Sequence, residues 1–268
     1  MEKIDEEKQE QSFLEHLEVL RWHLVRSSAA VFLFTVLAFI FPEILFDKII
    51  FAAKDPSFAT YRFFCWMSET LHFGEALCID EMPFELMNIN MSGQFSTHII
   101  SSVVAGFVLA FPYIFWEIWR FVKPALHDSE KKYSRGVVFY TSLLFSMGVL
   151  FGYYSVAPLS VQFLGNYQVS SEVVNQINLN SYISTVTTVC LTNGIVFLLP
   201  VLIYFLSKLG LITPAFLRQY RRHALVLLMI LAAVITPPDI MSLILVTFPL
   251  MLLYEVSIKV SARFQDEE

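Results

Sequence analysis

The chain has 268 residues, of which 56% are hydrophobic and 16% are charged, and its formal net charge is −6. Soluble domains carry about 25% charged residues. This composition, together with a mean hydropathy of +0.60, therefore excludes an ordinary soluble domain and indicates a membrane protein.

The first segment, residues 1–23, is acidic, with neither the basic start nor the small-residue cleavage site of a removable signal peptide. Ser12 and Glu15 match a capping box, which predicts a helix that begins there. Apolar residues then recur at helical spacing, at Phe13, Leu17, Leu20 and Leu24. We interpret residues 1–23 as a cytoplasmic amphipathic lead-in to the first span.

Six apolar segments follow. Four are long enough to cross a bilayer, which takes about 20 residues: 27–46, 99–119, 137–164 and 184–206. The last two, 224–235 and 240–253, have only twelve and fourteen residues. They are separated by the turn Thr236-Pro237-Pro238-Asp239, in which proline prevents a helix. We predict an all-α membrane protein that forms one domain, 1–268, with six transmembrane helices, of which the last two are unusually short.

The basic residues are distributed unevenly between the two sides of these segments. Fifteen of the eighteen Lys and Arg residues precede the first segment, follow the sixth, or lie between the second and third or the fourth and fifth. The other three, Lys48, Lys54 and Arg62, lie in the long loop 47–98. Because cytoplasmic loops are enriched in Lys and Arg, we predict that both termini are cytoplasmic and that loop 47–98 is external.

Two of the three cysteines, Cys65 and Cys78, lie in loop 47–98. If this loop faces an oxidising compartment, they can form a disulfide that closes a short segment of the chain. Two unpaired cysteines are the alternative.

The apolar segments lack ionisable residues, and this excludes several functions. Ion-driven transport and intramembrane catalysis need ionisable groups at depth, and none occurs in 27–42, 99–116, 137–164, 184–206 or 224–235. The six histidines show no metal-ligand spacing, and no HExxH, P-loop or GxSxG motif is present. We therefore expect no enzyme, no ion-driven pump, no metal and no cofactor.

Gly148 and Gly152 form a small-xxx-small motif that lets another helix approach closely.

Three motifs carry a resemblance to a known family. They are His16-Leu17-x-x-Leu20-Arg21, Phe121-x-x-Pro124-Ala-Leu126 followed by Glu130, and Thr236-Pro237-Pro238-Asp239 followed by Tyr254-Glu255. In this order and within six predicted spans, they resemble the TatC family, the multispan receptor subunit of the twin-arginine protein translocase. The resemblance extends from about Phe13 to Phe264.

The resemblance implies a bacterial plasma (inner) membrane protein that binds twin-arginine signal peptides and exports folded proteins with the proton-motive force. It also implies self-association, single-span partners similar to TatA and TatB, and no role in binding nucleic acid. The implied signal-peptide site consists of Glu130, Glu15, Glu18, Arg21, His16, Phe121 and Pro124. The implied partner-docking or hairpin residues are Thr236, Pro237, Pro238, Asp239 and Glu255. Acidic side chains suit such a receptor, because a carboxylate pairs bidentately with a guanidinium.

Three positions depart from the family pattern. The family usually has Glu two residues before the motif arginine, where this chain has Val19, and either Glu15 or Glu18 is left to replace it. An acidic residue that is common in the fourth span is replaced by Leu198, and a polar residue after the TPPD turn is replaced by Leu243. Two other functions remain as alternatives: a membrane scaffold for partner helices, and a small-solute permease.

Overall fold

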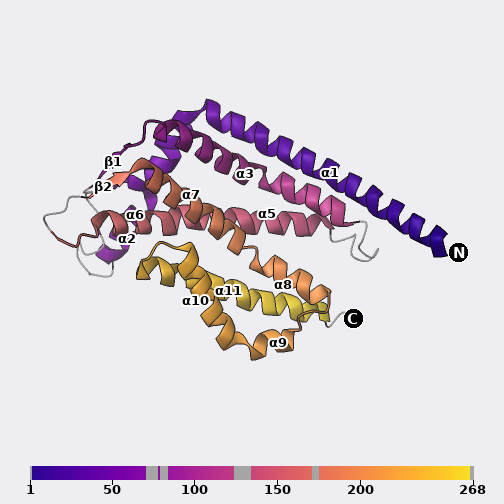
Figure 1. Cartoon of the computed structure of the whole chain (residues 1–268). Coiled ribbons are helices and arrows are strands. Elements are labelled where there is room, and N and C mark those ends of the chain that lie inside the picture. Colours follow the sequence, from indigo (N-terminus) through magenta and orange to yellow (C-terminus); the bar gives the residue numbers. More distant parts are fainter. Residues whose placement is uncertain (1, 71–77, 79–83, 124–133, 171–174, 266–268) are drawn as a thin grey trace. The chain divides into compact units, whose positions relative to one another are not determined.

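The computed structural model describes residues 2–70, 78, 84–123, 134–170 and 175–265, and it describes side chains from Leu17 onward except at 134–135 and 263–265. Most of these residues are helical (Figure 1). The chain divides into two compact units. Unit 1 comprises Met1–Ile40 and Ser102–Leu143, and unit 2 comprises Phe41–Ser101 and Leu144–Glu268.

Unit 1 is built from α1 (Glu2–Ile40), most of α3 (Gly93–Val122) and the first half of α5 (Ser134–Phe151). The expected helix start at Ser12 is wrong, because α1 is continuous from Glu2. Residues 2–10 consist mainly of Glu, Lys and Gln, which favour helix, and acidic residues in a first turn are stabilised by the helix dipole. The lead-in and the first span are therefore one helix.

α1 and α3 approach closely at Gly106. A Cβ atom added to Gly106 would lie 2.6 Å from the backbone nitrogen of Thr35 and 2.9 Å from its Cα. Any larger residue would push the two helices apart, so the absence of a side chain at this position sets how α1 and α3 pack.

Unit 2 begins with an irregular segment before its long helices. Its first elements are a π-helix (Glu43–Ile50), a 3₁₀ turn (Phe51–Lys54), α2 (Ala59–Thr70) and strand β1 (Glu85–Met87). β1 pairs in parallel with β2 (Gln176–Asn178), with Leu86 opposite Ile177. The strands connect two segments that are about 90 residues apart in the sequence.

Three tyrosines fasten this irregular segment to the helices of unit 2. Their hydroxyls donate to backbone carbonyls: Tyr61 to Ala53 and Pro158, Tyr153 to Ile49, and Tyr182 to Ile50, all at 2.8–2.9 Å. The last carbonyls of a helix lack partners within it. Tyr182 and Tyr61 supply partners to Ile50 and Ala53, at the ends of the two short helical segments. Burial raises the pKa of Tyr61, so its hydroxyl keeps the donated proton well above neutral pH.

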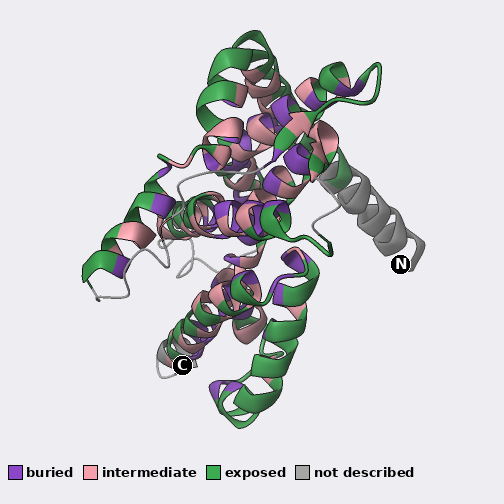
Figure 2. Cartoon of the chain, turned by 90° about the vertical axis from the view of Figure 1, so that its left-hand side faces the viewer, coloured by how far each residue is buried: buried purple, intermediate pink, exposed green. Residues whose placement is uncertain are grey.

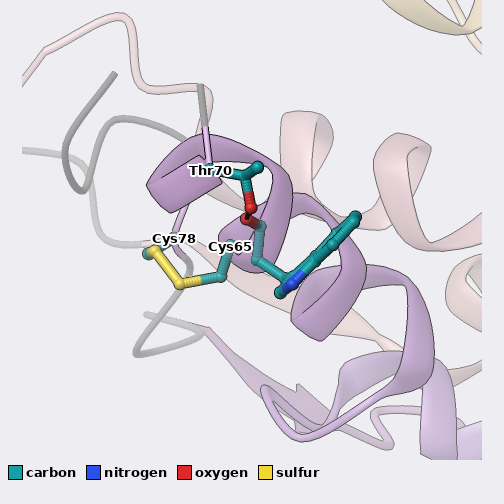
Figure 3. The surroundings of a disulfide bond; sticks show 4 residues. Cys65, Thr70 and Cys78 are labelled. Atoms are coloured by element: carbon teal, nitrogen blue, oxygen red, sulfur yellow. Dashed lines mark hydrogen bonds between the residues drawn. A yellow bond between two sulfur atoms is a disulfide. The ribbon is translucent and has the colours of Figure 1, made fainter. Parts of the chain in front are cut away.

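Cys65 of α2 and Cys78 are joined by a disulfide, with their Cα atoms 4.4 Å apart (Figure 3). The structure thus contains the bridged form of the two alternatives that the sequence left open. A bridge over 13 residues is worth about 3 kcal/mol in the chain-entropy model. It ties the middle of α2 to Cys78.

The expected close approach at Gly148 and Gly152 is confirmed, and the partner is α7 (Leu179–Val196). A Cβ atom added to Gly148 would lie 2.9 Å from the Cα of Gly194, and one added to Gly152 would lie 3.0 Å from the Cα of Cys190. Backbones this close gain van der Waals contact without needing polar groups.

Among the described residues, five helices are long and apolar enough to cross a membrane. They are Leu17–Ile40, Gly93–Val122, Gly136–Asn166, Leu179–Lys208 and Ile240–Ala262. The first four agree with the four long spans expected from the sequence, with shifted bounds. Their apolar side chains are widely exposed (Figure 2), as expected of helices that face lipid.

The expectation that both final helices are short is wrong for the second. α11 runs from Ile240 to Gln265 and has 26 residues. The helix continues past the apolar stretch because nothing in residues 254–265 interrupts it, although polar residues appear there. α10 (Arg221–Ile235) has 15 residues and covers only about 22 Å, which is less than the roughly 30 Å of a hydrocarbon core.

The remaining helices of unit 2 are α6 (Ala157–Asn166), α8 (Leu199–Lys208) and α9 (Pro214–Gln219), with a short π-helical segment, Gly152–Val156, before α6. α11 packs against both α8 and α10. Near the end of this packing, Ser207 of α8 is hydrogen-bonded to Ser261 of α11. α11 thus makes most of the contact between the final hairpin and the rest of the unit, and α10 adds a contact with α7.

Reporter fusions will test the predicted orientation. We expect fusions near residues 75 and 172 to read as external and fusions near 128, 215 and 268 to read as internal, because the Lys and Arg residues are concentrated on one side. Paired alkaline phosphatase and fluorescent-protein reporters, which are active on opposite sides, provide the measurement. An internal signal at residue 75 would contradict the six-span topology.

Candidate functional site

α1 presents an exposed apolar stripe at the end predicted to face the cytoplasm. A shallow depression of about 410 Å³ follows one face of the helix and is lined by Leu17, Leu20, Arg21, Leu24, Val25 and Ser28. Leu17, Leu20 and Leu24 of the expected stripe line the depression. Phe13, its fourth expected member, lies where the structure describes the backbone alone.

Glu18 and Arg21 lie at the start of this stripe. Nη2 of Arg21 donates to Oε1 of Glu18 at 3.3 Å, and both side chains are about two-thirds exposed. Arg21 also lies over the ring of Trp22, with 5.7 Å between Cζ and the ring centroid. An exposed ion pair within one helix is worth only about 0.3–0.5 kcal/mol. The carboxylate of Glu18 is therefore available to another cation at little cost.

A second carboxylate lies at the same end of unit 1 and is buried. Glu117 of α3 has a side chain that is 1% exposed. Its Oε2 contacts Nδ1 of His23 on α1 and lies 3.9 Å from Nη1 of Arg26, while its Oε1 lies 3.5 Å from Nη1 of Arg120. The ring of Phe121 meets the ring of His23 edge-on at 6.1 Å between centroids.

This cluster fastens α1 to α3 and also concentrates charge. A carboxylate removed from water is tolerated only where cations and hydrogen bonds compensate it. Three basic side chains from two helices surround Glu117, and two of them, Arg26 and Arg120, are about half exposed. No function was predicted for Glu117 from the sequence. The feature of the sequence that could have pointed to it is an acidic residue at the end of an otherwise uncharged span, three residues before Arg120.

The TPPD turn is held by a cluster of buried polar groups in unit 2. Oδ1 of Asp239 accepts from the backbone N–H of Ser242 at 2.5 Å, which is the bond of a helix N-cap. Oδ2 accepts from the hydroxyl of Ser160 on α6 at 3.4 Å, and the hydroxyls of Ser160 and Ser242 are 3.1 Å apart. Thr236 bonds back to the carbonyl of Ala232. The turn motif therefore caps α11 and binds it to α6.

Leu243 is one of the three departures expected from the resemblance, and the residue before it is polar. The preceding residue, Ser242, is fully buried and makes the two hydrogen bonds described above. A polar contact at this level of α11 is thus present, one position earlier in the sequence.

Glu255 lies at the other end of the hairpin. Its Oε2 accepts from Nη2 of Arg221, the first residue of α10, at 2.8 Å. Its neighbour Tyr254 is buried and donates to the carbonyl of Leu217 in α9 at 2.9 Å. These contacts tie the start of α10 to the middle of α11, and they give Glu255 a structural partner.

Several expected site residues cannot be placed. Pro124 and Glu130 lie outside the described residues. Glu15 and His16 lie in α1, where the backbone alone is described. Of the implied signal-peptide site, the described side chains are Glu18, Arg21 and Phe121. Within the described part of the chain, no group of three or more His, Cys, Asp or Glu is arranged to hold a metal ion.

Comparisons with known proteins agree with one another. A family model described as "Sec-independent protein translocase protein (TatC)" matches residues 15–249. The protein of that name from Blattabacterium sp. subsp. Periplaneta americana is 42% identical over 256 residues, which cover 95% of this chain and 96% of the relative. The one from Desulforapulum autotrophicum is 33% identical, with 95% and 86% covered. A crystal structure of the twin-arginine translocase receptor TatC in DDM aligns with a TM-score of 0.69 and 30% identity, covering 92% of this chain and 99% of that chain.

Proposed function

The chain belongs to the TatC family of Sec-independent protein translocase proteins, and we propose that it is the subunit that binds twin-arginine signal peptides. It is a component of a translocase and not an enzyme. The proposal extends to its setting: the plasma membrane of a bacterium, with single-span partners similar to TatA and TatB and with export of folded proteins driven by the proton-motive force.

One observation carries the proposal: α1 presents charge and apolar surface in the order that such a peptide needs. A twin-arginine signal peptide has its arginines first and its apolar segment afterwards. Glu18 pairs with Arg21, which lines the start of the exposed stripe, and Leu20, Leu24 and Val25 continue along the stripe. An extended or helical apolar ligand can bury its side chains on such a surface, while its arginines remain at the end where the carboxylates lie.

Crosslinking in membranes tests this directly. A photoreactive residue at Leu24 should capture a peptide that carries two arginines followed by an apolar segment, and should capture the twin-lysine version less well, because an ammonium cannot bind a carboxylate bidentately. Leu227, an exposed apolar residue of α10, is the matched control. Equal capture at Leu24 and Leu227, or no preference for arginine, would contradict the proposal.

A further inference from the structure

One face of α1 carries Val19, His23 and Arg26. At 3.6 residues per turn, their side chains leave the helix within about 60° of one another. Val19 is the position at which the family usually has an acid, and it is apolar here. From Val19 to Arg26, this face therefore carries two basic groups and no acid.

α3 brings an acid to this face. Oε2 of Glu117 contacts Nδ1 of His23 and lies 3.9 Å from Arg26. His23 is one turn, about 6 Å, further along α1 than Val19. A carboxylate from a different helix is thus present on this face, one turn along α1 from the position that lacks an acid.

The chain's own arginines lie at long ion-pair distances from this carboxylate. Arg120 and Arg26 approach Glu117 at 3.5 and 3.9 Å, which is longer than the roughly 2.7–2.9 Å of a charge-assisted hydrogen bond. Both guanidiniums are about half exposed. Arg120 also lies over the ring of Trp116, at 5.0 Å from the centroid, and this cation–π contact remains available when the arginine leaves Glu117.

We infer that Glu117 is a carboxylate of the arginine site, and that Arg26 and Arg120 occupy it until an arginine of the signal peptide replaces one of them. The inference rests on the proposed function. A buried carboxylate that loses its partner is strongly destabilised, and exchange of one guanidinium for another keeps Glu117 paired. The same exchange favours arginine over lysine, because the ammonium cannot reproduce the planar fork.

Binding of a fluorescent twin-arginine peptide to the full chain in lipid nanodiscs tests the inference. Arg120→Gln removes an internal competitor and should tighten binding by about fivefold. Glu117→Gln should weaken binding by at least about tenfold. Arg221→Gln is the control, because it removes a guanidinium from the Glu255 pair in unit 2 and should leave binding unchanged.

The sign of the Arg120→Gln effect is decisive. If Glu117 only fastens α1 to α3, Arg120→Gln loosens this contact and leaves peptide binding unchanged or weaker, and that result overturns the inference. Should Glu117→Gln fail to fold, the Arg120→Gln variant still tests the inference.

Glu130→Gln separates the inference from the proposed function. If Glu130→Gln weakens binding while the Arg120 and Glu117 variants bind as wild type does, the inference fails and the proposed function stands. If wild type binds twin-arginine and twin-lysine peptides equally, the proposed function itself fails.

Discussion

Insertion of four leucines after Leu231 should leave the chain in the membrane but reduce export of a folded cargo by about ten- to hundredfold. The insertion lengthens α10 by about 6 Å, from 15 residues to nearly the thickness of the hydrocarbon core. Because the unmodified helix is too short for the core, we expect the bilayer beside it to thin. At a fraction of a kcal/mol per Å of mismatch, the insertion changes the local lipid energy by on the order of 1–3 kcal/mol. We expect the loss of thinning to raise the barrier to passage by a comparable amount.

Export is measured with a folded fluorescent reporter that carries a twin-arginine signal peptide, and insertion is measured by membrane fractionation. The matched control inserts four leucines after Leu252 in α11, which is already 26 residues long. This control displaces residues of the same hairpin, but it does not correct a mismatch between helix length and the thickness of the hydrocarbon core. Equal losses in the two variants would attribute the effect to disturbed packing, and unchanged export in the α10 variant would show that the shortness of α10 has no role.

Glu130→Gln should weaken binding of a twin-arginine peptide by about one to two decades. Hydrogen bonds between charged groups are worth about 1.5–3 kcal/mol, and each 1.4 kcal/mol is a factor of ten in the dissociation constant. Glutamine keeps the shape of the side chain and removes its charge. Fluorescence anisotropy with twin-arginine and twin-lysine peptides provides the measurement, and the variant should also lose part of the preference for arginine.

Glu15→Gln and Glu18→Gln serve as comparisons in the same assay. Glu18 already pairs with the exposed Arg21, and an exposed ion pair is worth at most about 1 kcal/mol. We expect one of these two variants to weaken binding about as much as Glu130→Gln does, and the other to change binding by less than about fivefold. A tenfold loss in either would identify it as the replacement for the acid missing at Val19. Wild-type binding in the Glu130, Glu15 and Glu18 variants together would contradict the receptor proposal.

The four long spans followed from the sequence because they depend on neighbouring residues alone. A run of about 20 apolar residues identifies a spanning helix, and α3 and α7 appear where such runs occur. The contact at Gly148 and Gly152 was also predictable, since two small residues four apart permit close approach on any apolar partner. The order of the family motifs is likewise a property of the sequence, and the comparisons agree with it.

The ends of helices were less predictable. α1 begins at Glu2 because the Glu, Lys and Gln residues before its apolar part have high helix propensity. α11 continues to Gln265 because nothing in residues 254–265 interrupts it. A search for apolar stretches does not detect such extensions, which is why the second half of the final hairpin was expected to be short.

Contacts between helices were decided by the tertiary structure. Glu117 meets His23 across 94 positions of the sequence, and Ser160 meets Asp239 across 79. In a soluble helix the apolar face shows which side packs inward. In a helix surrounded by lipid nearly every face is apolar, so periodicity does not show which residues of two helices meet. Residues close in the sequence were therefore enough to show that this chain crosses a membrane and which family it resembles. The contact of Glu117 with His23 depends instead on how α1 is rotated and packed against α3.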